Sequence, residues 1–244
     1  MMKKLNLLHL CPDLMGLYGE YANLAVLRRH LEAAGVEVTI TLDPCDSTPD
    51  FSHADFIYMG TGTERSQKAA LSRLLPHADA LHQALERGAV VLFTGNAMET
   101  LGASITDAKG THFQGLSLAD FITIETDRRV PEDVIAVTPL WDTPLVGFMN
   151  KCSTTSGITT PLFPSLTLGF GNEAEDGAEG YVSGNLFATH ITGPVLVKNP
   201  SFTDLMLCRL FAAKGWELPN PLPVLPHEHE AYTVTLRELQ ARIR

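Results

Sequence analysis

Cysteine is scarce in this sequence, and long hydrophobic runs are missing. The chain has only four cysteines, which are Cys11, Cys45, Cys152 and Cys208. They are scattered without a CxxC spacing, which disfavours a zinc site and predicts reduced thiols in a cytoplasmic protein. The longest apolar runs, such as residues 89–93, are too short to cross a bilayer, so no membrane span is expected.

Positive charge is also in short supply. The 18 Lys and Arg residues are outnumbered by 28 Asp and Glu residues, which gives a net charge of −10. This balance argues against a general nucleic-acid binder and against a binder of anionic membranes. Hydrophobic residues make up 45% of the 244 residues, enough for the core of a large α/β domain.

Strands and helices alternate through the first half of the chain. Hydrophobic patterns predict strands at residues 5–10, 36–42, 55–59 and 89–94. Helical spacing of apolar residues predicts helices at 24–34 and 65–87. This alternation predicts an α/β fold with three layers, a mostly parallel sheet with helices on both faces. Ligands in such sheets bind at the carboxyl edge of the strands, where three of the predicted turns lie.

The second half differs in composition. Residues 120–187 are rich in β-branched residues, Gly and Pro, which predicts an antiparallel extension attached to the parallel sheet. Its strands are expected at 121–125, 134–138 and 166–170. A helix is expected from Ser201 or Phe202 to Ala213. We expect one domain over residues 1–217, followed by an extended linker and a short helix over residues 218–244.

One turn raises a question of mechanism. The apolar strand "AVVLFT" runs into the turn "GN" and then into the expected helix "AMETL". In α/β enzymes such a corner often displays a Ser or Cys nucleophile. Here it holds Gly95 and Asn96, and neither can attack a substrate.

Seven segments resemble, in order and spacing, the class I glutamine amidotransferases of the cobyric acid synthase type. They are residues 9–35, 59–67, the turn at Gly95, 126–134, 147–150, 169–180 and 189–200. The best match within this family is the glutaminase subunit that works with a Mur-ligase-like enzyme to amidate the peptidoglycan precursor lipid II. The resemblance spans about residues 5 to 212. It implies a flavodoxin-like fold, a Mur-ligase-like partner and no cofactor.

The family's chemistry depends on a Cys that attacks the glutamine amide, backbone N–H groups that hold the oxyanion, and a His that protonates ammonia. By this resemblance Gly95 stands at the position of the Cys, and Thr192 at that of the His. His190 lies two residues before Thr192. The oxyanion loop corresponds to Gly60, Thr61, Gly62, Thr63 and Glu64, followed by Arg65 and Gln67.

Loss of the nucleophile of a covalent hydrolase costs about 10⁶-fold in rate. Together with the resemblance, this implies a degenerate subunit that docks on a Mur-ligase-like synthetase or binds a small amide, carboxylate or anion. The candidate ligand-binding residues are Gly60, Thr61, Gly62, Arg65, Asn96, Ala97 and Arg129. Gly95 alone is also compatible with a relaxed turn of no function, and Arg129 with an ordinary surface arginine.

An active enzyme that uses a displaced residue is the alternative. Cys11 ends the first strand and can lie near the same edge, although a lone cysteine there is more typical of a small buried hydrophobe. His190 can donate to a bound carboxylate or serve a structural role. The "HEHE" segment at residues 227–230 is a weak metal signal, and a solvated tail is expected there.

Overall fold

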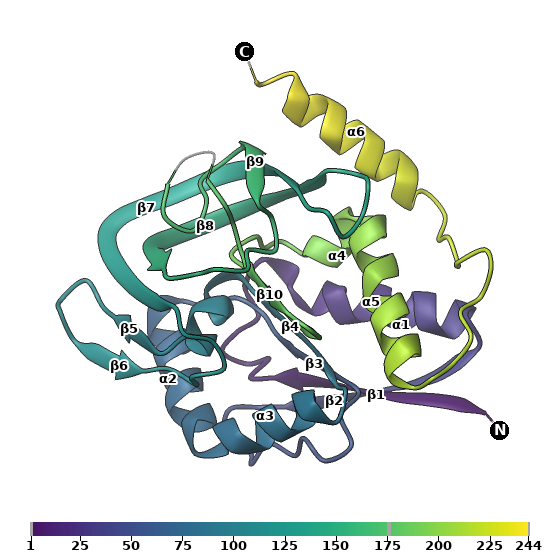
Figure 1. The fold of residues 1–244 in the computed structure, drawn as a ribbon, viewed down its shortest axis with the longest axis horizontal. Coiled ribbons are helices and arrows are strands. Elements are labelled where there is room, and N and C mark those ends of the chain that lie inside the picture. Colours follow the sequence, from purple (N-terminus) through teal and green to yellow (C-terminus); the bar gives the residue numbers. More distant parts are fainter. Residues whose placement is uncertain (1, 175–176, 244) are drawn as a thin grey trace.

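The computed structural model describes residues 2–174 and 177–243 (Figure 1). Residues 175 and 176, inside the matched segment 169–180, lie outside the described ranges, as do both terminal residues. A six-stranded sheet has the order β10-β11-β4-β3-β1-β2. Its strands are β1 Lys3–Leu10, β2 Val36–Asp43, β3 Phe56–Met59, β4 Val90–Thr94, β10 Tyr181–Ser183 and β11 Leu186–Thr189.

All neighbouring strands in this sheet are parallel except the edge strand β10, which is antiparallel to β11. Helices α1 (Tyr21–Ala33), α4 (Val195–Lys198) and α5 (Pro200–Ala213) pack on one face. Helices α2 (Glu64–Leu74) and α3 (Ala78–Glu86) pack on the other face. The predicted α/β architecture with a mostly parallel sheet is therefore confirmed.

The expected single helix over residues 65–87 is wrong in one respect. A 3-10 turn, η2 (Leu75–His77), separates α2 from α3. Pro76 lies in this turn, and proline lacks the backbone N–H that an uninterrupted helix needs. The remaining residues keep the predicted apolar stripe, since Leu71, Leu74 and Leu81 are all buried.

The residues expected to form an antiparallel extension build a second, mostly antiparallel sheet. It contains β5 Ser104–Thr106, β6 His112–Gln114, β7 Ile122–Val137, β8 Leu145–Ser156 and β9 Ser165–Leu168. The strands expected at 121–125 and 134–138 belong to the single long strand β7, whose register shifts between Glu125 and Val130. Figure 1 shows the curved β7–β8 pair, and β8 contacts the turn that follows β4.

The C-terminal segment is longer and better anchored than expected. Helix α6 spans Glu228–Gln240 and contacts β7, β8, α4 and α5. The buried His30 of α1 lies 2.8 Å from the Glu228 carboxylate, so the "HEHE" segment is not a free tail.

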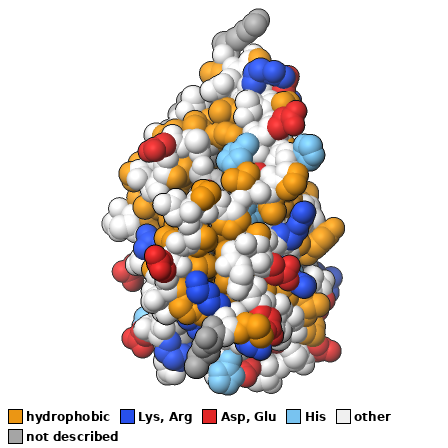
Figure 2. Space-filling model, turned by 90° about the vertical axis from the view of Figure 1, so that its right-hand side faces the viewer, with side chains coloured by type: hydrophobic (Ala, Val, Ile, Leu, Met, Phe, Trp, Pro, Cys, Tyr) orange, Lys and Arg blue, Asp and Glu red, His pale blue; other side chains and the backbone are white. Residues whose placement is uncertain are grey.

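On the side shown in Figure 2, hydrophobic side chains are interspersed with charged ones. The domain boundary at residue 217 stays a prediction.

The described ranges contain neither a membrane-spanning helix nor a cluster of metal ligands. Within residues 2–174 and 177–243, no helix is long and apolar enough to span a bilayer. The same residues contain no group of three or more His, Cys, Asp or Glu side chains placed to hold a metal ion.

Candidate functional site

The corner after β4 is built around Gly95. Strand β4 ends at Thr94, and residues Gly95–Leu101 form a 3-10 helix, η3, in place of the expected α-helix. Gly95 is buried and has a φ of +61°, a left-handed conformation that glycine adopts without steric cost. The corner therefore has the shape on which a nucleophile could be displayed, but no side chain.

Thr61 fills the space beside Gly95. A Cβ atom placed ideally on Gly95 would lie 2.1 Å from the Thr61 hydroxyl oxygen and 2.3 Å from the Thr61 Cβ. Such distances are far below van der Waals contact. Any side chain at position 95 is therefore incompatible with the present position of Thr61.

Asn96 bonds to the loop that carries Thr61. Its side-chain oxygen accepts from the Gly62 N–H at 3.0 Å and from the Thr61 hydroxyl at 3.1 Å, and its amide nitrogen donates to the Gly62 carbonyl at 3.0 Å. The backbone N–H of Asn96 donates to the Thr61 hydroxyl at 3.2 Å. Donors from both the loop and the corner thus have partners within the chain, and an incoming carbonyl oxygen would have to displace them.

Glu20 links the corner to Thr192. This carboxylate, just before α1, is fully buried. One oxygen accepts the hydroxyl of Thr192 and, at 2.7 Å, the N–H of Gly193. The other accepts the hydroxyls of Thr94 and Tyr58. Burial and the charge of Glu20 raise the pKa of Tyr58 well above its ordinary value. Thr192 and the residue before Gly95 therefore share one carboxylate.

His190 is directed into a different cluster. Its ring is buried, with Nδ1 3.2 Å from the Glu179 carboxylate and Nε2 3.7 Å from the Glu99 carboxylate. The backbone N–H of His190 also donates to Glu179 at 2.7 Å. The imidazole thus lies between two acids, and none of its bonds reaches Gly95 or Thr61.

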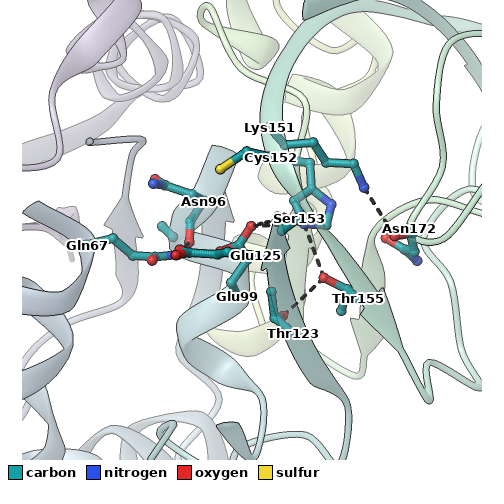
Figure 3. A network of polar contacts seen from close by, with 12 residues as sticks. Gln67, Asn96, Glu99, Thr123, Glu125, Lys151, Cys152, Ser153, Thr155 and Asn172 are labelled. Carbon is teal, nitrogen blue, oxygen red and sulfur yellow. Dashed lines mark hydrogen bonds and ion pairs between the residues drawn. The ribbon is translucent and has the colours of Figure 1, made fainter. Parts of the chain in front are cut away.

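A polar network continues from Glu99 between the corner and strands β7 and β8 (Figure 3). Glu99 accepts from Gln67 at 2.6 Å and from the Ser153 hydroxyl, and Gln67 also donates to the Asn96 carbonyl at 2.5 Å. Lys151 is 3% exposed and donates to the Gly171 carbonyl at 2.5 Å. Burial lowers the pKa of Lys151 to about 8.

The two arginines proposed as ligand-binding residues are both exposed. Arg129 lies at the irregular part of β7, where it forms an ion pair with Glu64 at 2.5 Å and donates to the Asn150 carbonyl at 3.3 Å. Arg129 therefore connects the second sheet to the first turn of α2. The Arg65 side chain makes no hydrogen bond or ion pair with the residues that the structure describes. Ala97 is fully buried.

No hydrogen bond joins the thiol of Cys11 or of Cys152 to Gly95. The Cys11 sulfur lies 3.3 Å from the Cys45 sulfur, and burial raises the pKa of Cys11. Cys152 lies 3.3 Å from a Glu64 oxygen, and burial, with the Glu64 charge, raises the pKa of Cys152 to about 12. The reactive thiolate is therefore disfavoured at both positions near neutral pH.

Sequence reasoning missed the buried charges of this region. Glu20, Glu99, Glu179 and Lys151 are each at most 3% exposed. Ionisable residues are rarely buried, so a single sequence gives no reason to place them inside. It did identify Thr61 and Asn96, but as residues that bind a ligand rather than each other.

The chain is similar to known proteins in both sequence and fold. A profile of the CobB/CobQ-like glutamine amidotransferase domain matches residues 6–200. The chain belongs to this family. A solved structure described as a glutamine amidotransferase has a TM-score of 0.54 at 13% identity, over 84% of this chain and 98% of that one. That likeness supports the amidotransferase fold.

Two relatives of this amidotransferase-family chain are each named lipid II isoglutaminyl synthase (glutamine-hydrolyzing) subunit GatD. The protein from Staphylococcus aureus (strain N315) is 30% identical over 217 residues, which are 88% of this chain and 87% of the relative. The protein from Streptococcus pneumoniae (strain ATCC BAA-255 / R6) is 27% identical over 199 residues, which are 80% of this chain and 76% of the relative.

Proposed function

We propose that this chain is a subunit without glutaminase activity that docks on a Mur-ligase-like synthetase. The observation that carries the proposal is the position of Thr61. Its side chain occupies the space that any side chain on Gly95 would need. The nearby backbone donors are also taken, since the Gly62 N–H bonds to the Asn96 side chain and the Asn96 N–H bonds to the Thr61 hydroxyl. The site is therefore filled by its own residues as well as missing its nucleophile.

Each step of carboxamide hydrolysis lacks a group here. Gly95 has no atom that can attack, so no acyl intermediate can form at the corner. The N–H groups of Gly62 and Asn96 bond to Asn96 and Thr61, so they are not free for an oxyanion. Thr192 donates its proton to the buried Glu20, and an alcohol is too weak an acid to protonate ammonia.

The proposed docking is supported by the relatives. Both are named as subunits of a synthase, and the similarity covers most of either chain. The frame around the site is also kept, with a parallel sheet, a sharp corner and two buried clusters that hold its loops. A fold kept without its reacting groups is suited to a structural role in a complex, whose synthetase would then use free ammonia.

The other candidate functions have weaker support. A small amide or carboxylate would have to displace Asn96 from Gly62 before it reached the corner. A displaced nucleophile at Cys11 would act from a buried thiol that contacts Cys45 instead of the corner. A base at His190 would act from a ring held between Glu99 and Glu179.

The test is reconstitution with the Mur-ligase-like protein of the same organism. We expect the two chains to co-elute in size-exclusion chromatography. We expect the complex to amidate its substrate with ammonium chloride and not with glutamine. The Staphylococcus aureus synthase, named as glutamine-hydrolyzing, is the positive control for the glutamine assay. Separate elution would refute the docking, and glutamine-dependent product would refute the loss of activity.

A further inference from the structure

Two free thiols meet where neighbouring parallel strands end. Strand β1 ends at Leu10 and β2 at Asp43, and the Cys11 N–H donates to the Asp43 carbonyl at 2.8 Å. Two residues beyond Asp43, Cys45 places its sulfur 3.3 Å from that of Cys11. Both cysteines are unpaired. The sulfurs are therefore already closer than the sum of two van der Waals radii, about 3.6 Å, on the scale of ordinary non-bonded contacts.

The two thiols differ in burial and in the charge beside them. Cys11 is fully buried, while Cys45 is half-buried. The Arg73 guanidinium lies 3.7 Å from the Cys11 sulfur, and an ion pair with Asp43 at 2.8 Å holds it there. Burial keeps the pKa of the Cys11 thiol above its ordinary value, and the Arg73 cation opposes this effect.

We propose that Cys11 and Cys45 form an oxidation site that closes into an intramolecular disulfide. The co-reactant is a peroxide or a low-molecular-weight disulfide. With hydrogen peroxide, the Cys45 thiolate attacks one oxygen, the O–O bond breaks, and a sulfenic acid and one water result. The Cys11 sulfur then attacks the Cys45 sulfur, the S–O bond breaks, and the displaced hydroxide takes the Cys11 proton to form the second water. Two thiols lose two electrons, and one peroxide is reduced.

The cross-link would tie the two strand-end loops together. The loop after Cys11 carries Leu17, whose N–H donates to the Thr61 carbonyl at 3.0 Å, and Asp13, which accepts the Cys45 N–H at 3.0 Å. A bond between residues 34 positions apart also restricts the unfolded chain. The oxidised protein should therefore melt at a higher temperature than the reduced protein.

The test treats the purified chain with hydrogen peroxide or with diamide and then counts thiols after denaturation. Wild type should lose two of its four thiols, and a non-reducing peptide map should link the peptides of Cys11 and Cys45. Dithiothreitol should restore both thiols. Cys208→Ser, which changes another half-buried cysteine, should retain the link, and Cys45→Ser should keep all its thiols.

Melting curves distinguish oxidation of the Cys11–Cys45 pair from oxidation elsewhere in the chain. The melting temperature should rise on oxidation in wild type and in Cys208→Ser, and stay unchanged in Cys45→Ser. Circular dichroism of the reduced proteins checks that each variant is folded. Four free thiols after treatment of wild type, a link between any other pair of cysteines, or disulfide-linked dimers would overturn the proposal.

Discussion

The Thr61 side chain occupies the space that a side chain on Gly95 would need. A Cβ atom on Gly95 would lie 2.1 Å from the Thr61 hydroxyl oxygen, so only glycine fits at the corner while Thr61 stays in place. The two residues belong to different turns, one after β3 and one after β4. The turn that carries no side chain at Gly95 is thus packed by a side chain from the other turn.

This relationship predicts the outcome of a double-mutant cycle. Gly95→Ala should destabilise the fold by about 2–5 kcal/mol, because the positive φ costs about 1–2 kcal/mol and overpacking against Thr61 about 1–3 kcal/mol. Thr61→Gly should remove the overpacking part, so the two changes should be strongly non-additive. Urea unfolding of the four proteins measures the coupling.

Gly35→Ala is the matched control for backbone strain. Gly35 has a φ of +77°, and a Cβ there would have no neighbour within 4 Å. This change should cost about 1 kcal/mol, from the left-handed conformation alone, and should be additive with Thr61→Gly. Additive behaviour of Gly95→Ala and Thr61→Gly would contradict the mutual exclusion of the two side chains.

Glu20 is expected to be essential for stability. Its oxygens accept three hydroxyls and the N–H of Gly193, and it is fully buried. Glu20→Gln removes the charge and turns one acceptor into a donor that faces other donors, which should cost about 3 kcal/mol or more. Chemical denaturation of the variant measures this loss.

Glu32→Gln is the comparison for an exposed acid. Glu32 pairs with Arg28 at 2.6 Å on the surface of α1, with both side chains more than 40% exposed. Such a pair contributes about 0.3–0.5 kcal/mol. Equal effects of the two substitutions would show that the Glu20 cluster does not hold the corner and Thr192 together.

The buried Lys151 should make the free energy of unfolding depend on pH in alkaline solution. Its pKa falls from 10.5 in the unfolded chain to about 8 in the fold because it is buried. Between these values the unfolded state binds the extra proton, so its contribution to stability rises with pH from 8 to 10.5. The difference amounts to about 3 kcal/mol at most. Below pH 8 the penalty is fully present.

Lys151→Met isolates this contribution. Raised thiol and tyrosine pKa values, as at Cys152 and Tyr58, act in the opposite direction, so the wild-type curve alone is not decisive. The difference in unfolding free energy between wild type and Lys151→Met should shift in favour of wild type between pH 8 and 10.5. Parallel curves would mean that Lys151 stays protonated in the fold.

Much of the fold follows from the sequence because local patterns determine it. Buried strands such as residues 5–10 and 89–94 read as apolar runs, and the Leu71, Leu74 and Leu81 stripe marks the helical layer. The second sheet was harder to predict. Strand β7 carries Pro131 and charged residues in its middle, a pattern that resembles a loop between two short strands.

The sequence was enough to predict where the site lies but only some of the residues and contacts that form it. The corner at Gly95 followed from a strand that runs into a glycine turn. The contact of Thr61 with Gly95 did not, since it depends on the distance between two turns that are 34 residues apart. Glu20 gave no signal either, because a glutamate before a helix is usually solvated.

The decisive measurement is ammonia release from glutamine by the purified chain, followed as glutamine is increased at neutral pH. We predict no release above the uncatalysed background for wild type, for Cys11→Ser and for His190→Gln. Release that saturates with glutamine in wild type would contradict the filled and nucleophile-free corner. Its loss in Cys11→Ser or His190→Gln would identify the displaced residue responsible.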